Sequence, residues 1–249
     1  MKIALVSDVH GNLDALLAVL EDLERRGCRQ IYCCGDVVGY GAEPNECCRV
    51  LRAYWAERPL RPYPVVLGNH DEAVAILTAT PNFNPHAARA ADWTRRQLSP
   101  DNCAWLASLP FQISLGPMLL SHATAAEPGE WRYLIGEYET DRDLAWFTQH
   151  RPERFYAVGH SHYPFIQSRE GRHQDYEMVQ MEEDLRYAVN VGSVGQPRDG
   201  DARACYAVFD DAAMTLQLVR VGYDVAMAQR RIRAAGLPAL LAERLAAGR

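Results

Sequence analysis

Lysine is almost missing from this chain of 249 residues, because Lys2 is its single lysine. A P-loop needs a lysine after its glycines, and a pyridoxal enzyme needs one for its Schiff base. Lys2 stands at the start of the first expected strand, where it is suited to neither task. The sequence therefore excludes a P-loop, pyridoxal chemistry and a lysine nucleophile.

Long apolar runs and cysteine pairs of the Cys-x-x-Cys type are also absent. No apolar stretch reaches the ~20 residues that a membrane-spanning helix needs, and residues 1–7 lack the layout of a signal peptide. We therefore expect a cytoplasmic protein without a membrane partner. We interpret the seven cysteines as reduced, partly buried small hydrophobic residues rather than as a zinc or redox site.

Basic residues are fewer than acidic ones, so the chain has a formal net charge of −6. This argues against extended nucleic-acid binding, because such proteins carry a basic track for the phosphate backbone. A small anion such as a nucleotide stays compatible, since a metal site can supply local positive charge. A serine hydrolase is disfavoured, because there is no Gly-x-Ser-x-Gly elbow and Ser193 lacks the flanking pattern.

The first third of the chain alternates strand-like and helix-like segments. Buried-strand patterns cover residues 2–7, 30–34 and 64–67, and helical patterns cover residues 12–26 and 44–58. This β-α-β-α-β order predicts a layered α/β fold whose first strands are mainly parallel.

The rest of the chain adds helices and then mostly strands. Helical patterns at 85–98 and 101–109 fall in a segment, about 78–109, that we expect to form a helical cap beside the site. Residues from about 224 to 249 form further helices, which could pack on the domain or across a homo-oligomer. We predict a single α/β (α+β) domain, residues 1–249, with two packed sheets and helices outside. Its remaining strands are expected at 111–115, 118–121, 155–158, 163–168, 187–191, 204–210 and 214–221.

Five of the expected strand ends carry residue types that bind metals. Ligand sites in α/β folds form at strand ends, and Asp8 and His10 would point to one side of an extended backbone. Mixed oxygen and imidazole ligands suit zinc, iron, manganese or nickel better than calcium or magnesium alone. The candidate ligands lie in Asp8-Val9-His10, Gly35-Asp36, Gly68-Asn69-His70-Asp71, Ser121-His122 and Gly159-His160-Ser161-His162.

Each of these motifs also has a structural interpretation. Asp36 after glycine could cap a turn, and residues 69–71 could begin a helix. His122 could be a hydrogen-bonded core histidine, and His160 and His162 need not bind metal when taken alone. The need for helix and turn caps does not by itself explain suitable ligands at five strand ends, so the combination favours a metal site.

Taken in order, these motifs resemble the calcineurin-like metallophosphoesterase superfamily. The resemblance spans residues 8–162, and further stretches at 35–41 and 190–198 are similar to its small bacterial branch, some members of which resemble diadenosine tetraphosphatases and phosphodiesterases. It implies a four-layer α-β-β-α sandwich with two mixed sheets and a dinuclear metal site at strand ends. The residues after about 224 are not covered by it.

The resemblance also implies a ligand set and a mechanism. Asp36 would bridge two divalent metals, and a hydroxide between them would attack the phosphorus of a phosphodiester or nucleotide-type substrate. His70 would face the scissile phosphate. The metal identity stays open among manganese, iron, zinc and nickel. The implied ligands are Asp8, His10, Asp36 and His162 for one metal, and Asp36, Asn69, His122 and His160 for the other.

Substrate contacts are expected outside the metal ligands, each with an alternative. Arg198 could bind a second phosphate or pair with Asp199 or Asp201. Tyr40 could line the pocket or be structural, and Asn12 could contact phosphate or cap the first helix.

Two further questions stay open at this point. Asp71 could orient His70 or cap the following helix, and Trp131 and Tyr133 could stack a nucleobase or pack ordinarily. The competing function is a non-catalytic metal-binding interaction scaffold, since some relatives of the fold carry an eroded metal site. The intact ligand set argues for the enzyme.

Overall fold

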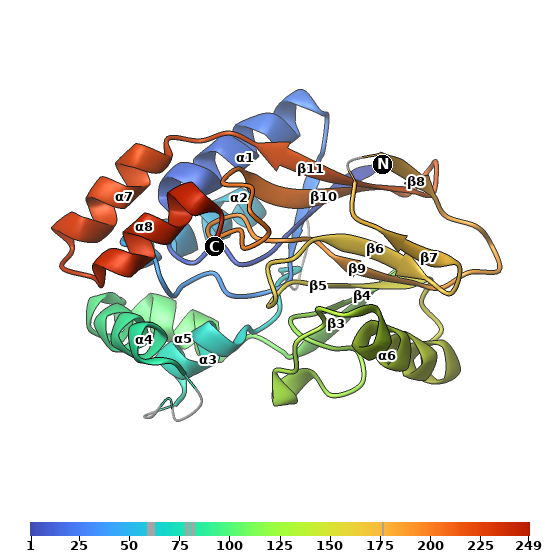
Figure 1. Ribbon diagram of the computed structural model, residues 1–249, viewed down its shortest axis with the longest axis horizontal. Helices are drawn as coiled ribbons and strands as arrows, with labels where there is room; N and C mark the ends of the chain where they lie inside the picture. Colours follow the sequence, from blue (N-terminus) through green and yellow to red (C-terminus); the bar gives the residue numbers. More distant parts are fainter. Residues whose placement is uncertain (59–62, 78–79, 81–82, 176) are drawn as a thin grey trace.

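Two mixed β-sheets stack face to face in the computed structural model, with helices on both outer faces (Figure 1). The structure describes residues 1–249 apart from 59–62, 78–79, 81–82 and 176. The first sheet has the order β2 (Gln30–Cys33), β1 (Lys2–Val6), β10 (Ala204–Asp210), β11 (Thr215–Val221) and β8 (Met178–Gln180). The second has the order β3 (Gln112–Leu115), β4 (Met118–Ser121), β5 (Phe155–Val158), β9 (Tyr187–Asn190), β6 (Phe165–Ser168) and β7 (Gly171–His173).

The alternation of side chains in β1 shows how the layers form. Ile3 and Leu5 join Phe155 and Phe209 in the apolar cluster between the sheets. Ala4 and Val6 face the opposite way, toward the helices. Both faces of the strand are thus buried, which accounts for its continuous apolar run.

Helices cover the outer face of each sheet. α1 (Leu13–Arg25) and α2 (Pro44–Ala56) pack on the first sheet, and α6 (Glu137–His150) packs on the second through Leu144 and Phe147. The predicted four-layer α/β sandwich is therefore confirmed. Among the described residues, no helix combines the length and apolar character that crossing a membrane demands.

A group of helices stands at one end of the sandwich (Figure 1). It comprises α3 (Asn69–Ala75), α4 (Pro85–Gln97), α5 (Pro100–Ala107), α7 (Val225–Ala234) and α8 (Ala239–Ala247). α4, α7 and α8 share an apolar cluster around Tyr40. The expected cap, about 78–109, contains α4 and α5, although part of that segment lies outside the described residues.

Several elements differ from the expectation. The strand predicted at 64–67 is reduced to an isolated bridge between Val65 and Cys33. α6 was not predicted, because its buried residues include the polar Thr140 and Asp143 as well as Leu144 and Phe147. The short strands β7 and β8 and the 3-10 turn Pro128–Glu130 were also missed, since none of them has a marked apolar pattern.

Candidate metal centre

The candidate ligands meet at the carboxyl ends of two pairs of parallel strands. β1 is parallel to β2 in the first sheet, and β4 is parallel to β5 in the second. The loops after these strands carry Asp8, Asp36, His122 and His160, and α3 begins at Asn69. Because parallel strands end at the same edge, residues far apart in the chain converge on one site.

The backbone at these ligands is left-handed rather than extended. Asp8 and His10 have φ of 53° and 49°, and Asp36, His160 and His162 have φ of 52°, 60° and 62°. Only seven non-glycine residues of the described chain have positive φ, and five of them are these ligands. The expectation that extended backbone aligns Asp8 with His10 is therefore wrong, since each residue is turned inward separately. Such uncommon conformations concentrate at functional sites.

Two glycines let the loops approach one another closely. A Cβ added to Gly68 would lie 2.0 Å from Oδ1 of Asp36, and one added to Gly159 would lie 2.1 Å from Oδ2 of Asp8. Any larger residue at either position would displace a candidate ligand. These glycines are therefore required by the packing of the site.

One side of the centre is formed by Asp8, His10 and His162. Nε2 of His162 lies 3.0 Å from Oδ1 of Asp8 and 3.2 Å from Nε2 of His10. Nε2 of His10 lies 3.5 Å from Oδ1 of Asp8 and 3.6 Å from Oδ2 of Asp36. All four side chains are buried.

The other side is formed by Asp36, Asn69, His122 and His160. Nε2 of His122 lies 3.4 Å from Oδ2 of Asp36 and 3.1 Å from Oδ1 of Asn69. The ring of His160 lies 5.0 Å from the ring of His122, centroid to centroid. Asp36 touches both sides, as a bridging carboxylate would.

Backbone carbonyls determine which nitrogen of each histidine faces the centre. Nδ1 of His10 donates to the carbonyl of Val38 at 3.1 Å, and Nδ1 of His162 donates to that of Gln196 at 2.5 Å. Their Nε2 atoms then present two lone pairs to each other 3.2 Å apart. That arrangement is repulsive unless a cation lies between them, so the donor set fits a metal ion.

The second pair of histidines is oriented in a complementary way. Nδ1 of His122 donates to the carbonyl of Cys34 at 2.7 Å, which leaves Nε2 for a metal. Nε2 of His160 donates to the carbonyl of Trp131 at 2.8 Å, which leaves Nδ1 instead. The two tautomers differ because the backbone carbonyl binds Nδ1 in His122 and Nε2 in His160.

The electrostatics of the centre favour the ligand form of most groups. Burial lowers the pKa of His160 to about 3 and that of His162 to about 4, so both are neutral. Burial would raise the pKa of Asp8, but His162 holds it well below the ordinary value. Burial likewise lowers the pKa of His122, yet the Asp36 carboxylate outweighs it and raises the value to about 9. A metal would have to displace the His122 proton.

A hydrogen-bonded chain leads from the centre to Arg198. Nε2 of His70 lies 3.0 Å from the hydroxyl of Tyr40, to which Nη2 of Arg198 donates at 3.3 Å. Arg198 also donates to Oε1 of Gln196 at 3.1 Å. The alternative ion pairs for Arg198 are not formed, because Asp199 pairs with Arg220 and Asp201 pairs with Arg203.

Asp71 is placed for structural support. Its carboxylate accepts hydrogen bonds from the N–H groups of Val37 at 3.3 Å, Val38 at 3.1 Å and Gly68 at 3.2 Å. Burial and the charge of Asp36 raise the pKa of Asp71 to about 7. This geometry favours the helix-cap interpretation, and the residue bonded to His70 is Tyr40.

Asn12 is also occupied by the protein. Its Oδ1 accepts from the N–H of Ala15 at 3.2 Å, and its Nδ2 donates to the carbonyl of Gly195 at 2.9 Å and to the hydroxyl of Tyr223 at 3.3 Å. These bonds cap α1 and tie it to the loop before Arg198. The side chain is buried and keeps no free donor for a phosphate.

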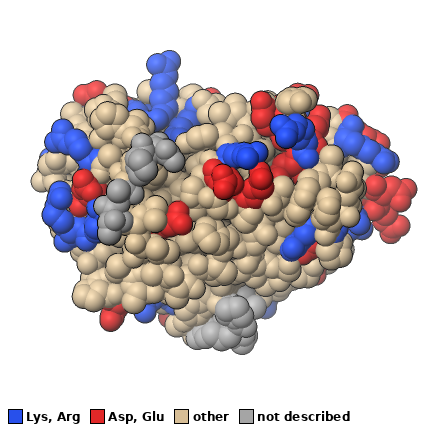
Figure 2. Space-filling view, turned by 90° about the horizontal axis from the view of Figure 1, so that it is seen from below, with Lys and Arg blue, Asp and Glu red and all other residues tan. Residues whose placement is uncertain are grey.

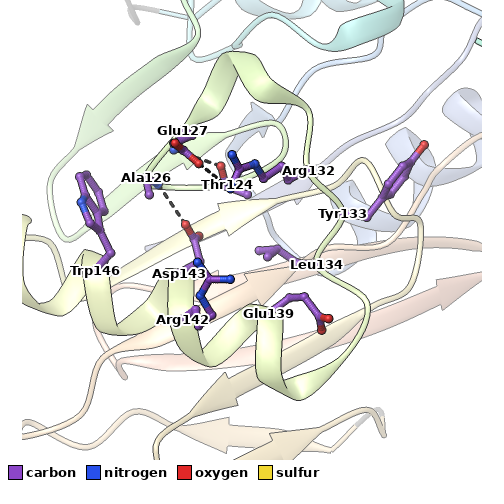
Figure 3. A pocket seen from close by; sticks show the side chains of 10 residues that line it. All are labelled: Thr124, Ala126, Glu127, Arg132, Tyr133, Leu134, Glu139, Arg142, Asp143 and Trp146. Atoms are coloured by element: carbon purple, nitrogen blue, oxygen red, sulfur yellow. Dashed lines mark hydrogen bonds and ion pairs between the residues drawn. The ribbon is translucent and has the colours of Figure 1, made fainter. Parts of the chain in front are cut away.

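A cavity of about 390 Å³ has no candidate ligand in its lining but is connected to the site by Tyr133 (Figure 3). Tyr133 lines one end of it and stacks on His160 at 4.1 Å between centroids, and Trp146 stands at the other end. Nε1 of Trp131 donates to Glu72 at 3.0 Å, so its indole is partly held by the protein. The cavity was not foreseen, because it forms between α6, which was missed, and the loop after His122.

Comparisons with known proteins agree with this geometry. Residues 1–213 match the family model of the calcineurin-like phosphoesterase superfamily domain. The uncharacterized protein MJ0912 of Methanocaldococcus jannaschii is 40% identical over 256 residues, covering 99% of this chain and 98% of that protein. The chain belongs to the calcineurin-like phosphoesterase superfamily.

Solved structures support the same assignment. A metallophosphoesterase from Sphaerobacter thermophilus is 36% identical with a TM-score of 0.86, covering 100% of this chain and 99% of that chain. The hypothetical protein PH1004 of Pyrococcus horikoshii OT3 is 19% identical with a TM-score of 0.77, covering 98% and 97%, and so shares the fold. The protein is accordingly an enzyme of the phosphoester hydrolase class with a metal-binding site.

Proposed function

We propose that the protein hydrolyses a phosphodiester or a nucleotide-type phosphoester with two divalent metal ions. The observation that carries this proposal is the shared Asp36 carboxylate flanked by imidazoles whose lone pairs converge. Asp8, His10, Asp36 and His162 would hold one ion, and Asp36, Asn69, His122 and His160 the other. The donor types suit manganese, iron, zinc or nickel.

Two bound divalent ions would activate a water molecule at neutral pH and offset charge on the phosphoryl oxygens. Their charge exceeds that of the two ligand carboxylates, so the loaded centre attracts phosphate. On the face shown in Figure 2, described Lys and Arg side chains are scattered among Asp and Glu without a continuous basic stripe. Together with the net charge of −6, the absence of such a stripe on this face agrees with a small substrate rather than an extended nucleic acid.

His70 is placed to donate a proton or a hydrogen bond to the leaving oxygen. Arg198 donates to the Tyr40 oxygen, so the Tyr40 hydroxyl can donate its own hydrogen to Nε2 of His70. His70 then carries its hydrogen on Nδ1, a buried atom with no hydrogen-bond partner. Burial lowers the pKa of His70 well below its ordinary value, which keeps the ring neutral. A neutral Nδ1–H suits interaction with charge that develops during the reaction.

The cellular setting follows from the sequence and is part of this proposal. All seven cysteines are free thiols, and six of them are buried. Burial raises the pKa of Cys33 to levels at which its thiolate does not form, and it likewise raises the pKa of Cys205 to about 12. Such inert thiols agree with a cytoplasmic enzyme.

The test is hydrolysis of bis-p-nitrophenyl phosphate and of p-nitrophenyl phosphate by chelator-stripped protein with manganese restored. Asp36→Asn removes the shared ligand. Loss of a residue that only hydrogen-bonds to a metal ligand lowers activity by about 10–100-fold, so kcat should fall by more than that in Asp36→Asn. Asp92→Asn, an exposed carboxylate on α4, is the matched control and should keep full activity. The ratio of the two substrates distinguishes diesters from monoesters.

One result would leave the interaction scaffold as the better function. It is a folded wild-type protein that binds two metal ions per chain yet turns over neither substrate with any of the four metals. Failure to bind metal at all would instead remove the dinuclear centre from the proposal.

A further inference from the structure

The C-terminal helices α7 and α8 form part of the wall around the metal centre. They follow residues 1–213, the part of the chain that the family model matches. Tyr40 shares a buried cluster with Leu241 and Leu245 of α8. The N–H of Gly200 donates to the carbonyl of Gly248 at 2.9 Å, which ties the end of α8 to the loop that carries Arg198. In Figure 1, α8 lies between α7 and the ends of the sheets.

Two arginines belong to this wall: Arg198 in the loop beside Tyr40, and Arg244 between two residues of α8 that pack in the Tyr40 cluster. Arg198 is half-buried, its guanidinium carbon lies 5.7 Å from the centre of the Tyr40 ring, and its Nε is buried without a partner. Arg244, on α8, is also half-buried, and its Nε donates to the main-chain oxygen of Arg249. The outer nitrogens of Arg244 are therefore left for another acceptor.

Neither guanidinium group is paired with an acidic side chain of the described chain, and the acceptor of Arg244 is the main-chain oxygen of Arg249, the last residue of the sequence. Asp199 and Asp201, the nearest carboxylates in sequence to Arg198, are paired with other arginines. Across the described part of the chain, neither Arg198 nor Arg244 forms an ion pair with a carboxylate side chain. Burial lowers the pKa of Arg244, and the neighbouring positive charge of Arg198 lowers it further. An anion between them would relieve this repulsion.

The position of this pair relates it to the proposed reaction. Only the Tyr40 hydroxyl separates Arg198 from His70, with hydrogen bonds of 3.3 Å and 3.0 Å on its two sides. A group bound at the arginines would thus lie a short spacer away from a phosphate at the metals. The planar guanidinium fork matches the oxygens of a phosphate group.

We propose that Arg198 and Arg244 form an anion subsite for a second phosphate group of the substrate. This rests on the proposed function, because the first phosphate is assigned to the metal centre. The substrate class is then a molecule with two phosphate groups joined by a short spacer. Arg244 is a specificity-determining residue contributed by α8.

Calorimetric titration of the full-length, manganese-loaded protein tests the subsite without any need for turnover. The probes are propyl phosphate, with one phosphate, and propane-1,3-diyl bisphosphate, with two. Wild-type protein should bind the bisphosphate at least about tenfold more tightly, since charge-assisted hydrogen bonds to the second phosphate are added. Arg244→Ala should remove this preference and leave the affinity for propyl phosphate unchanged, and Arg198→Ala should also remove the preference.

Two further variants keep the experiment interpretable. Arg233→Ala removes an exposed arginine from α7 and should keep the full preference, which controls for net charge. Arg244→Gln keeps much of the side-chain length and should behave like Arg244→Ala, even if the alanine variant folds poorly.

Equal binding of both probes by the wild type would overturn the subsite. A preference that survives Arg244→Gln would overturn the role of Arg244. Loss of hydrolysis in every assay with the bisphosphate preference intact would refute the enzymatic proposal and keep the subsite.

Discussion

The metal centre and the helical wall beside it are built in different ways. The centre is formed by short loops at strand ends, in which left-handed residues and glycines leave almost no freedom. The wall is formed by α4, α7 and α8, which pack through ordinary apolar contacts around Tyr40 and present long arginines. In the proposed enzyme, the chemistry, which tolerates little displacement, takes place at these tightly packed loops, and recognition of the second phosphate involves the helices.

The largest expected effect concerns the link between these two regions. His70→Ala should lower kcat by about 10²–10⁴-fold, because a positioned acid or hydrogen-bond donor is lost. Metal content, measured by elemental analysis of the purified variant, should stay at the wild-type level. His150→Ala, an exposed histidine at the end of α6, is the control and should change neither quantity. A His70 variant that loses metal would show instead that His70 belongs to the centre as a ligand.

The wall can be loosened separately from the centre. Leu241→Ala removes a fully buried side chain of the Tyr40 cluster and should lower the free energy of unfolding by about 2–5 kcal/mol. Leu240→Ala, at an exposed neighbouring position, should have little effect in the same denaturant titration.

If the two regions are separable, Leu241→Ala should keep its metal ions and lose preference for the bisphosphate probe. Loss of metal from the Leu241 variant but not from the Leu240 variant would contradict the separation. The helices would then support the centre itself.

Removal of a single metal ion should have an effect at the lower end of the range expected for Leu241→Ala. A ligand at a hundred times its Kd stabilises the folded state by about 2.7 kcal/mol for each site. For a chain of this size, that corresponds to a Tm lower by about 5–10 °C for each ion that the chelator removes. Thermal unfolding with and without manganese measures it, and Asp36→Asn should show a smaller shift. An unchanged Tm in wild-type protein would contradict binding at a preformed centre.

Much of the fold and of the candidate site could be predicted from local sequence. β1, β2 and β5 are short, largely apolar runs buried on both faces, and a candidate ligand follows each within two or three residues: Asp8, Asp36 and His160. A buried strand followed closely by such a residue can be recognised from the sequence, because a strand that is buried on both faces is a short run of apolar residues. α6 could not be recognised in this way, because two of its four buried residues, Thr140 and Asp143, are polar.

The sequence by itself therefore determined the layered fold and the identity of the candidate ligands. Only the tertiary structure decided which nitrogen each histidine presents, since that depends on the carbonyls of Val38, Gln196, Cys34 and Trp131. It also decided that α8, which carries Arg244, packs beside Tyr40 and is tied to the loop of Arg198. These contacts join residues that are distant in the chain, and no local spacing encodes them, because they arise when separate layers pack together.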